Sequence, residues 1–295
     1  MIGALVGELR PKQWTKNLIL FAGVLFSQHL TDRQLLLRAA VGFIAFSLLA
    51  GSVYVLNDLK DLEVDRRHAV KRLRPLAAGR LPVAAVWIAL VPLLAITALL
   101  SAWLGPRFMA VAGLYVAFNL AYTFWLKQVV LVDVFMIAIG FVLRAIAGVQ
   151  LLLPVAPDTV LSPWLMVCTF FGALFLALAK RRREITNAGE EAANQRAVLE
   201  EYSPELLDGL LMVSAAASLM GYALYTIWPA TVAKFQTEAL LYTVPFVAYG
   251  IFRYLYLVRA TEATEDPSQV LLTDRPLAWC LGLYLLTVIL ILYRA

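Results

Sequence analysis

The chain has 295 residues, of which 62% are apolar and 15% charged, and its mean hydropathy is +0.78. Soluble domains contain about 45–50% apolar residues, so this composition excludes a soluble globular protein and indicates a membrane protein. Cys168 and Cys280 fall in apolar stretches, and His29 and His68 stand alone. We therefore expect neither a disulfide framework nor a zinc site.

Apolar runs long enough to cross a bilayer recur along the whole chain. Prolines near several of their ends are typical helix breakers. These runs predict an all-α polytopic membrane protein in which residues 1–295 form a single transmembrane domain. The nine expected spans are residues 15–31, 37–57, 82–102, 108–126, 129–150, 160–180, 209–228, 239–258 and 276–293.

Basic residues are unequally distributed between alternate loops of this topology. Nineteen of the 25 lysines and arginines fall on one side and five on the other, while Arg144 lies within a span. The side richer in basic residues faces the cytoplasm. The prediction is an integral protein of the cytoplasmic membrane, with its N-terminus and an active-site cavity on the cytoplasmic side and its C-terminus outside. The net charge of +5 follows from these loops and gives no reason to expect nucleic acid as a partner.

An acidic segment follows the second span directly. If the helix continues at about 100° per residue, Asp58, Asp61 and Asp65 lie within about 60° of one another, and Tyr54 lies on the same face. Like charges on one helix face repel one another. A divalent cation would neutralise them, and hard oxygen ligands suit Mg²⁺ that holds a phosphorylated substrate. The alternative is a solvated acidic loop, although six basic residues follow at once: Arg66, Arg67, Lys71, Arg72, Arg74 and Arg80.

Basic clusters are expected at the same membrane face as these carboxylates. They are Lys16 at the start of the first span, Lys127 after the fourth, and Lys180 with Arg181 at the end of the sixth. Lys180 and Glu184 share a helix face, so Glu184 can hold a basic side chain in place while that side chain binds phosphate. Each cluster also has a plain alternative, as an interfacial or loop residue or as part of a stop-transfer segment. An acidic cluster that faces basic ones favours a site for a metal-bound polyanion.

Two further ionisable residues lie in the fifth span. Arg144 is about 22 Å into that helix at 1.5 Å per residue. A charge at such depth is functional by default, but it can also reach outward or bond to a neighbouring helix, so no role is assigned to it. Asp133 lies near the cytoplasmic end and either faces the cavity or pairs with a basic neighbour.

The acidic segment, Asn57-Asp58-x-x-Asp61-x-x-x-Asp65, resembles the first aspartate motif of the UbiA superfamily of intramembrane prenyltransferases. The flanking segments are similar to the decaprenyl-phosphate phosphoribosyltransferase branch of that superfamily. No carboxylate pair follows the fourth span, where ordinary members carry a second aspartate motif; this branch lacks it too. The segments that carry the resemblance are residues 10–17, 65–75, 78–79, 120–127 and 143–148, and Lys180 to Glu184.

This resemblance implies transfer of phosphoribose from phosphoribosyl pyrophosphate to a polyprenyl (decaprenyl) phosphate, for a lipid-linked precursor of cell-wall arabinan. It implies that Asp58, Asp61 and Asp65, with Asn57, hold Mg²⁺ on the donor's diphosphate. The other substrate-binding residues that it implies are Lys16, Tyr54, Lys71, Arg74, Tyr122, Lys127, Lys180, Arg181 and Glu184.

Other functions compete with this interpretation. An aromatic prenyltransferase of the same superfamily would use a prenyl diphosphate donor, and the missing second aspartate motif argues against it. A transporter also places charges in a membrane bundle, but it often shows broken helices near the midplane, whereas these polar clusters gather at one face. Membrane lipids are expected partners and a homo-oligomer stays open, and neither the prenyl chain length nor the number of metal ions follows from the sequence.

Overall fold

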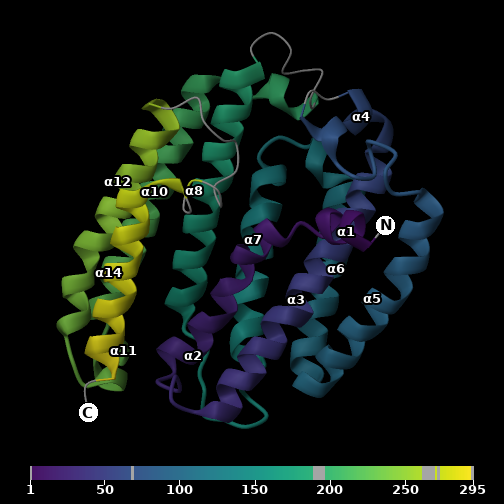
Figure 1. The fold of residues 1–295 in the computed structure, drawn as a ribbon. Coiled ribbons are helices and arrows are strands. Elements are labelled where there is room, and N and C mark those ends of the chain that lie inside the picture. The colour runs from purple at the N-terminus through teal and green to yellow at the C-terminus, as the bar shows by residue number, and fades with distance from the viewer. Residues whose placement is uncertain (1, 68–69, 189–196, 261–269, 271–272, 294–295) are drawn as a thin grey trace. The chain divides into compact units, whose positions relative to one another are not determined.

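The structure, a computed structural model, describes residues 2–67, 70–188, 197–260, 270 and 273–293. Within these residues the chain forms α-helices, 3₁₀-helices (η) and turns, with no strand. The all-α prediction is therefore confirmed. Figure 1 shows the helices, which are α1 (Ile2–Glu8), η1 (Pro11–Phe21), α2 (Ala22–Phe26), α3 (Arg33–Lys60), α4 (Leu62–Arg67), η2 (Lys71–Leu73), α5 (Val83–Leu104), α6 (Pro106–Phe124), η3 (Leu126–Gln128), α7 (Val132–Gln150), α8 (Pro163–Ala188), η5 (Ala197–Glu201), α10 (Pro204–Ile227), α11 (Pro229–Phe235), η6 (Ala239–Thr243), α12 (Val244–Ala260) and α14 (Arg275–Leu292).

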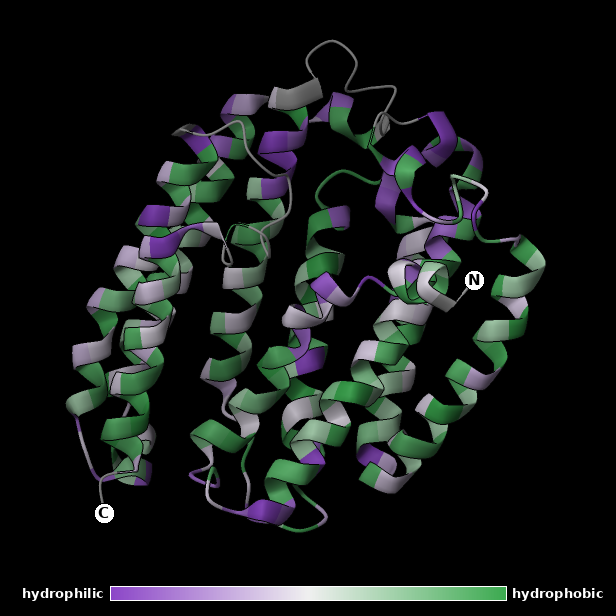
Figure 2. Ribbon diagram, in the orientation of Figure 1, coloured by the Kyte–Doolittle hydropathy of each residue, from purple (hydrophilic) through white to green (hydrophobic). Residues whose placement is uncertain are grey.

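Eight helical segments in the described part of the chain are long and apolar enough to cross a membrane. Apolar residues cover most of their length, and polar residues gather at their ends (Figure 2). The first expected span, residues 15–31, is different, because this region forms the 11-residue η1 followed by the 5-residue α2. A 3₁₀ segment of that length is uncommon, so tertiary contacts must hold it in place.

The chain divides into two compact units, and each is described by itself. The first comprises Met1–Met136 and Leu143–Val160, and the second comprises Ile137–Val142 and Leu161–Ala295. A single domain over residues 1–295 stays a prediction.

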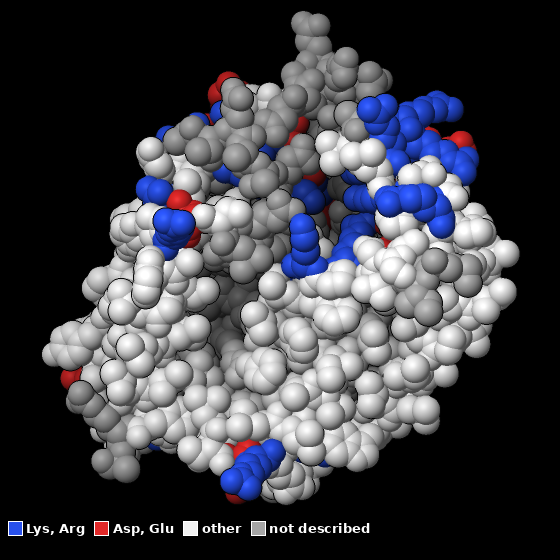
Figure 3. Space-filling model, viewed as in Figure 1, with Lys and Arg blue, Asp and Glu red and all other residues white. Residues whose placement is uncertain are grey.

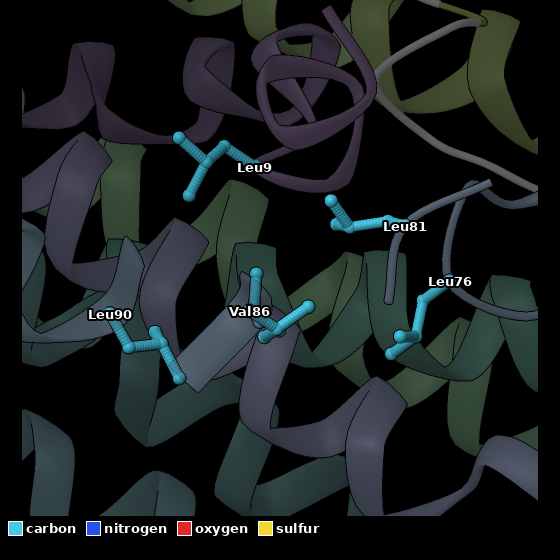
Figure 4. Packing of buried hydrophobic residues seen from close by; sticks show 6 residues of the cluster. Leu9, Leu76, Leu81, Val86 and Leu90 are labelled. Atoms are coloured by element: carbon cyan, nitrogen blue, oxygen red, sulfur yellow. The ribbon is translucent and has the colours of Figure 1, made fainter. Parts of the chain in front are cut away.

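A cluster of buried side chains joins the N-terminal segment to α3 and α5 in the first unit. It contains Leu9, Val55, Leu76, Leu81, Val86 and Leu90, most of which Figure 4 labels. Leu9 comes close to the backbone of α3 because residue 51 is a glycine; a Cβ there would lie 2.9 Å from the Leu9 side chain. The residues on either side of Leu9 are thereby fixed beside the cytoplasmic end predicted for α3.

Two glycines bring the N-terminal segment against α7. A Cβ on Gly23 would lie 2.3 Å from the Gly148 carbonyl oxygen, and one on Gly148 would lie 2.4 Å from the Leu20 carbonyl oxygen. Only hydrogen fits at these positions. This contact supplies the external support that η1 and α2 need.

Arg38 closes the other end of α3 against its neighbours. Its guanidinium donates hydrogen bonds to the carbonyl oxygens of Leu104 and Leu151, at the ends of α5 and α7, the second at 2.6 Å. Helix C-termini carry unpaired carbonyl groups and partial negative charge. A buried cation at this place satisfies both.

Small residues and polar pairs join the helices of the second unit. Gly172 of α8 lies opposite the Ser218 hydroxyl of α10, and Gly221 of α10 lies opposite Val167 and Cys168. Arg253 of α12 donates to Asp274, which caps the N-terminus of α14. Small contact residues let membrane helices approach closely.

Candidate functional site

Asp58 and Asp65 share one cation. The Nη1 atom of Arg74 donates to Asp58 Oδ1 at 3.0 Å and to Asp65 Oδ2 at 2.6 Å. Asp58 and Asp65 are 2% and 4% exposed. Buried carboxylates are costly unless they are paired and hydrogen-bonded, and Arg74 provides this for both. The structure therefore brings together three of the predicted site residues.

Asp61 lies at the break between two helices. The helix α3 ends at Lys60, Asp61 caps it, and α4 begins at Leu62, so the expected helix is not continuous. Asp61 accepts hydrogen bonds from Lys127 Nζ at 2.6 and 2.7 Å. These bonds link the end of α3 to η3, a connection that spans 66 positions of sequence.

Arg10 is a second cation on Asp58. Its Nη2 atom donates to both Asp58 oxygens, and its guanidinium lies 5.1 Å from the centre of the Tyr54 ring. Burial would lower the pKa of Arg10, but the Asp58 carboxylate outweighs it and raises that pKa, so the group stays charged. The backbone of Arg10 has φ 52° and ψ 64°, a left-handed conformation that is strained for a residue with a Cβ.

Glu8 adds a further carboxyl group to this cluster. It is 1% exposed, and its Oε2 atom accepts a hydrogen bond from the Leu76 amide. Its carboxyl lies beside the Asp58 carboxyl, and its Oε1 atom is buried without a hydrogen-bond donor. Burial, with this contact, raises the pKa of Glu8 to about 7. The cluster formed by Glu8, Arg10, Asp58, Asp65 and Arg74 is called the acidic cluster below.

The remaining predicted residues of the first unit lie on four different helices. Tyr54 lies one turn before Asp58 on α3 and contacts Arg10. Asn57 on α3, Lys71 on η2 and Tyr122 on α6 are half-buried, and Lys16 on η1 is half-buried beside the buried Asn17. Exposed basic side chains gather where α4 lies in Figure 3.

Arg144 lies in a buried polar network. It donates to Asn17 Oδ1 at 2.8 Å and to the Tyr115 hydroxyl at 2.7 Å, and Asn17 donates to the Ser47 hydroxyl at 3.0 Å. This network fastens η1 to α3, α6 and α7. Of the alternatives expected from the sequence, Arg144 therefore shows hydrogen bonding to neighbouring helices. Asp133 is fully buried at the start of α7.

The basic cluster of the second unit is internally paired. Glu184 accepts a hydrogen bond from Arg181 and lies 3.8 Å from Lys180. Arg182 pairs with Asp208 at 3.1 Å, and Arg183 donates to the Leu257 carbonyl at 2.6 Å. The expected pairing of Lys180 with Glu184 is present, and the buried Arg181 joins it. That these residues bind a substrate stays a prediction.

The acidic cluster suits a hard divalent cation by its chemistry. Its donors are carboxylate oxygens, and Glu8 offers a buried oxygen without a hydrogen-bond donor. Within the described residues no group of three acidic side chains is arranged to hold an ion; guanidinium groups lie against the carboxylates. A bound Mg²⁺ would be held by Asp58 and Asp65, with Asp61 and Asn57 as the other predicted ligands.

Two residues of this cluster, Arg10 and Glu8, were not predicted from the sequence. Arg10 belongs to the segment 10–17, in which only Lys16 was predicted to bind substrate, and Glu8 lies two residues before Arg10. Arg10 could have been predicted as a partner of Asp58, because a carboxylate at the end of an apolar helix needs a nearby cation. No pattern in the sequence places Glu8 beside Asp58, since 50 residues separate them.

Comparisons with known proteins identify the family of the chain. The UbiA prenyltransferase family matches residues 18–274. The decaprenyl-phosphate phosphoribosyltransferase of Corynebacterium glutamicum is 34% identical to the chain, over 92% of this chain and 82% of that protein. The protein of the same name from Mycolicibacterium smegmatis is also 34% identical, over 94% of this chain and 88% of its own length.

Solved structures share the fold. A UbiA homologue from Archaeoglobus fulgidus bound to GPP and Mg²⁺ superposes with a TM-score of 0.71 at 18% identity, over 98% of this chain and 99% of that one. The same homologue was also solved with Cd²⁺, with a TM-score of 0.68 at 17% identity. At these identities the likeness concerns the fold alone.

Proposed function

This chain belongs to the UbiA prenyltransferase family and is therefore a membrane-bound transferase, and we propose that it moves 5-phosphoribose from phosphoribosyl pyrophosphate to a polyprenyl phosphate with release of pyrophosphate. The observation that carries this proposal is that all three motif carboxylates are paired with cations of the same unit. One acidic group among several cations suits a single metal-bound diphosphate. The similarity to phosphoribosyltransferases over most of the chain supports the choice of donor.

We assign the proposed site residues to the metal ion and to the phosphorylated substrates. Asp58, Asp61 and Asp65, with Asn57, would hold Mg²⁺, which when bound offsets negative charge on the departing diphosphate. Lys71, Arg74 and Lys127 would bind phosphate oxygens, and Tyr54 would contact the ribose or diphosphate. Lys16, Tyr122, Lys180, Arg181 and Glu184 are the remaining proposed substrate residues.

The transfer requires little acid–base chemistry from the chain. The bond from ribose C1 to the pyrophosphate oxygen breaks, and an oxygen of the lipid phosphate forms the new bond to C1. The ribose centre gains oxocarbenium character on the way, as in glycosyl transfer. The nucleophile is already an anion, so the residues act by holding both phosphorylated substrates in line and by excluding water.

The proposed location follows from the loop charges. The end of α3 that carries the acidic cluster would face the cytoplasm, where a soluble donor is found, while the C-terminus would lie outside. The lipid product would serve as a precursor for cell-wall arabinan.

A transfer assay tests the proposal. Purified protein is mixed with labelled phosphoribosyl pyrophosphate, a polyprenyl phosphate and Mg²⁺, and label that enters the organic phase is measured. We expect lipid-soluble label from the wild type and none from Asp58→Asn, while Glu63→Gln, which removes an exposed carboxylate of α4, retains activity. Turnover of a prenyl diphosphate with an aromatic acceptor, and none of phosphoribosyl pyrophosphate, would replace this proposal with the aromatic prenyltransferase.

A further inference from the structure

We propose that Arg10 is a diphosphate-binding residue that rests on Asp58 until a metal-bound diphosphate enters, and then exchanges the carboxylate for a phosphate oxygen. This inference rests on the proposed function only in assuming a diphosphate donor. It assigns a role to a residue outside the aspartate motif and couples metal binding to donor binding.

Arg10 occupies the place on Asp58 where a metal ion would bind. Its guanidinium covers both oxygens of Asp58, the atoms that a metal ion needs. A metal ion bound to the same oxygens would bring a second positive charge against the Arg10 guanidinium, and the two cations would repel each other. Metal binding at Asp58 therefore favours movement of Arg10 away from that carboxylate, wholly or in part.

A metal ion would also reverse the net charge of the acidic cluster. The cluster holds the carboxyls of Glu8, Asp58 and Asp65 and the guanidiniums of Arg10 and Arg74. Adding a divalent cation makes this group net positive even with every carboxyl ionised. A buried positive excess is unfavourable without an anion, and a diphosphate supplies that anion at the same place.

Arg10 is held in position by neighbouring residues and is suited to bind an anion. Its side chain is about one quarter exposed, so it is not sealed from solvent. The Tyr54 ring lies against its guanidinium, and the preceding residue, Leu9, is anchored in the buried apolar cluster. The left-handed backbone of Arg10 is maintained by the surrounding contacts, and strain of this kind is concentrated at ligand-binding sites. A planar guanidinium also matches phosphate geometry.

The experiment measures two affinities whose changes have opposite signs. Mn²⁺ binding is followed by electron paramagnetic resonance, and pyrophosphate binding by calorimetry with and without Mg²⁺, in detergent. For Arg10→Gln we expect Mn²⁺ to bind several-fold more tightly without pyrophosphate, because the competitor for Asp58 is gone. Pyrophosphate with Mg²⁺ should bind at least tenfold more weakly. Arg66→Gln, which removes an arginine paired with the exposed Glu63, should change neither affinity.

A second variant tests the exchange from the other partner. Asp58→Asn should lose Mn²⁺ affinity but bind metal-free pyrophosphate more tightly, because Arg10 no longer has a carboxylate to occupy it. Adding Arg10→Gln to that variant should remove the gain. This arm also applies if Arg10→Gln alone fails to fold.

Two outcomes would overturn the inference. One is an unchanged pyrophosphate affinity in Arg10→Gln, which leaves Arg10 as a counter-ion only. The other is an unchanged or weaker metal-free pyrophosphate affinity in Asp58→Asn. Pyrophosphate is common to phosphoribosyl and prenyl donors, so failure of the transfer assay leaves this result intact, and the reverse also holds.

Discussion

Asp58 and Asp65 accept hydrogen bonds from the same nitrogen atom, Nη1 of Arg74, although they lie on different helices and are seven residues apart. A continuous helix would put them on one face, and the break at Asp61 preserves their proximity through this shared cation. Both buried carboxylates therefore depend on Arg74 for charge compensation.

Replacing Arg74 with methionine should lower stability. The change leaves two buried carboxylates short of one cation, and breaking a buried ion pair costs about 3–5 kcal/mol. Because Arg74 is itself partly exposed, we expect a smaller loss, about 1–3 kcal/mol. The measurement is the unfolding midpoint in detergent. Asp65→Asn in the same chain should recover part of the loss, and Arg66→Met should be neutral; equal effects of Arg66→Met and Arg74→Met would contradict the prediction.

Replacing Lys127 with methionine should impair donor use. Lys127 is a cation on Asp61, and removing one charge that stabilises a departing diphosphate costs about 10²–10³ in rate. We therefore expect kcat/KM for phosphoribosyl pyrophosphate to fall by about that factor, with the protein still folded. The matched control is Lys60→Met, which removes an exposed lysine that directly precedes Asp61. Activity near that of the wild type in Lys127→Met would remove Lys127 from the donor site.

Replacing Glu8 with glutamine should stabilise the metal-free protein. The amide keeps an oxygen for the Leu76 N–H and gives the Asp58 carboxyl a donor where a second carboxyl stood. At a pH above about 7, where the Glu8 carboxyl is ionised, loss of the like-charge contact and gain of a hydrogen bond together contribute about 1–2 kcal/mol. Thermal unfolding in a chelator should show a higher midpoint than the wild type. A lower midpoint would mean that Glu8 is stabilised by a group other than Asp58.

Replacing Gly148 with alanine should displace the N-terminal segment. The new Cβ would lie 2.4 Å from the Leu20 carbonyl oxygen and 2.7 Å from its Cα, both backbone atoms that cannot turn aside. We expect a lower unfolding midpoint and, because the displaced segment carries Arg10 and Lys16, weaker pyrophosphate binding.

The control for this prediction is Gly113→Ala on α6, where a Cβ would meet nothing within 4 Å. Alanine there should be neutral or stabilise the helix by up to about 1 kcal/mol. If Gly148→Ala leaves both stability and pyrophosphate affinity unchanged, the close approach of η1 to α7 is not required.

The amino-acid sequence by itself determined the class and most of the helices. An apolar run long enough to cross a bilayer can form all its backbone hydrogen bonds within itself only as a helix. Eight of the nine expected spans correspond to helices in the described residues. The motif carboxylates were also found from sequence, because charged residues at the end of an apolar helix stand out by spacing alone.

Only the tertiary structure decided which cation meets which carboxylate. The pairs Arg10–Asp58, Arg74–Asp65 and Lys127–Asp61 join residues 48, 9 and 66 positions apart. The 3₁₀ form of η1 was equally beyond the sequence, since Gly23, Gly148 and the Asn17–Arg144 bond impose it from outside. Helical periodicity fixes neighbours three or four residues apart, whereas contacts between helices depend on close approach of backbones that are distant in the chain.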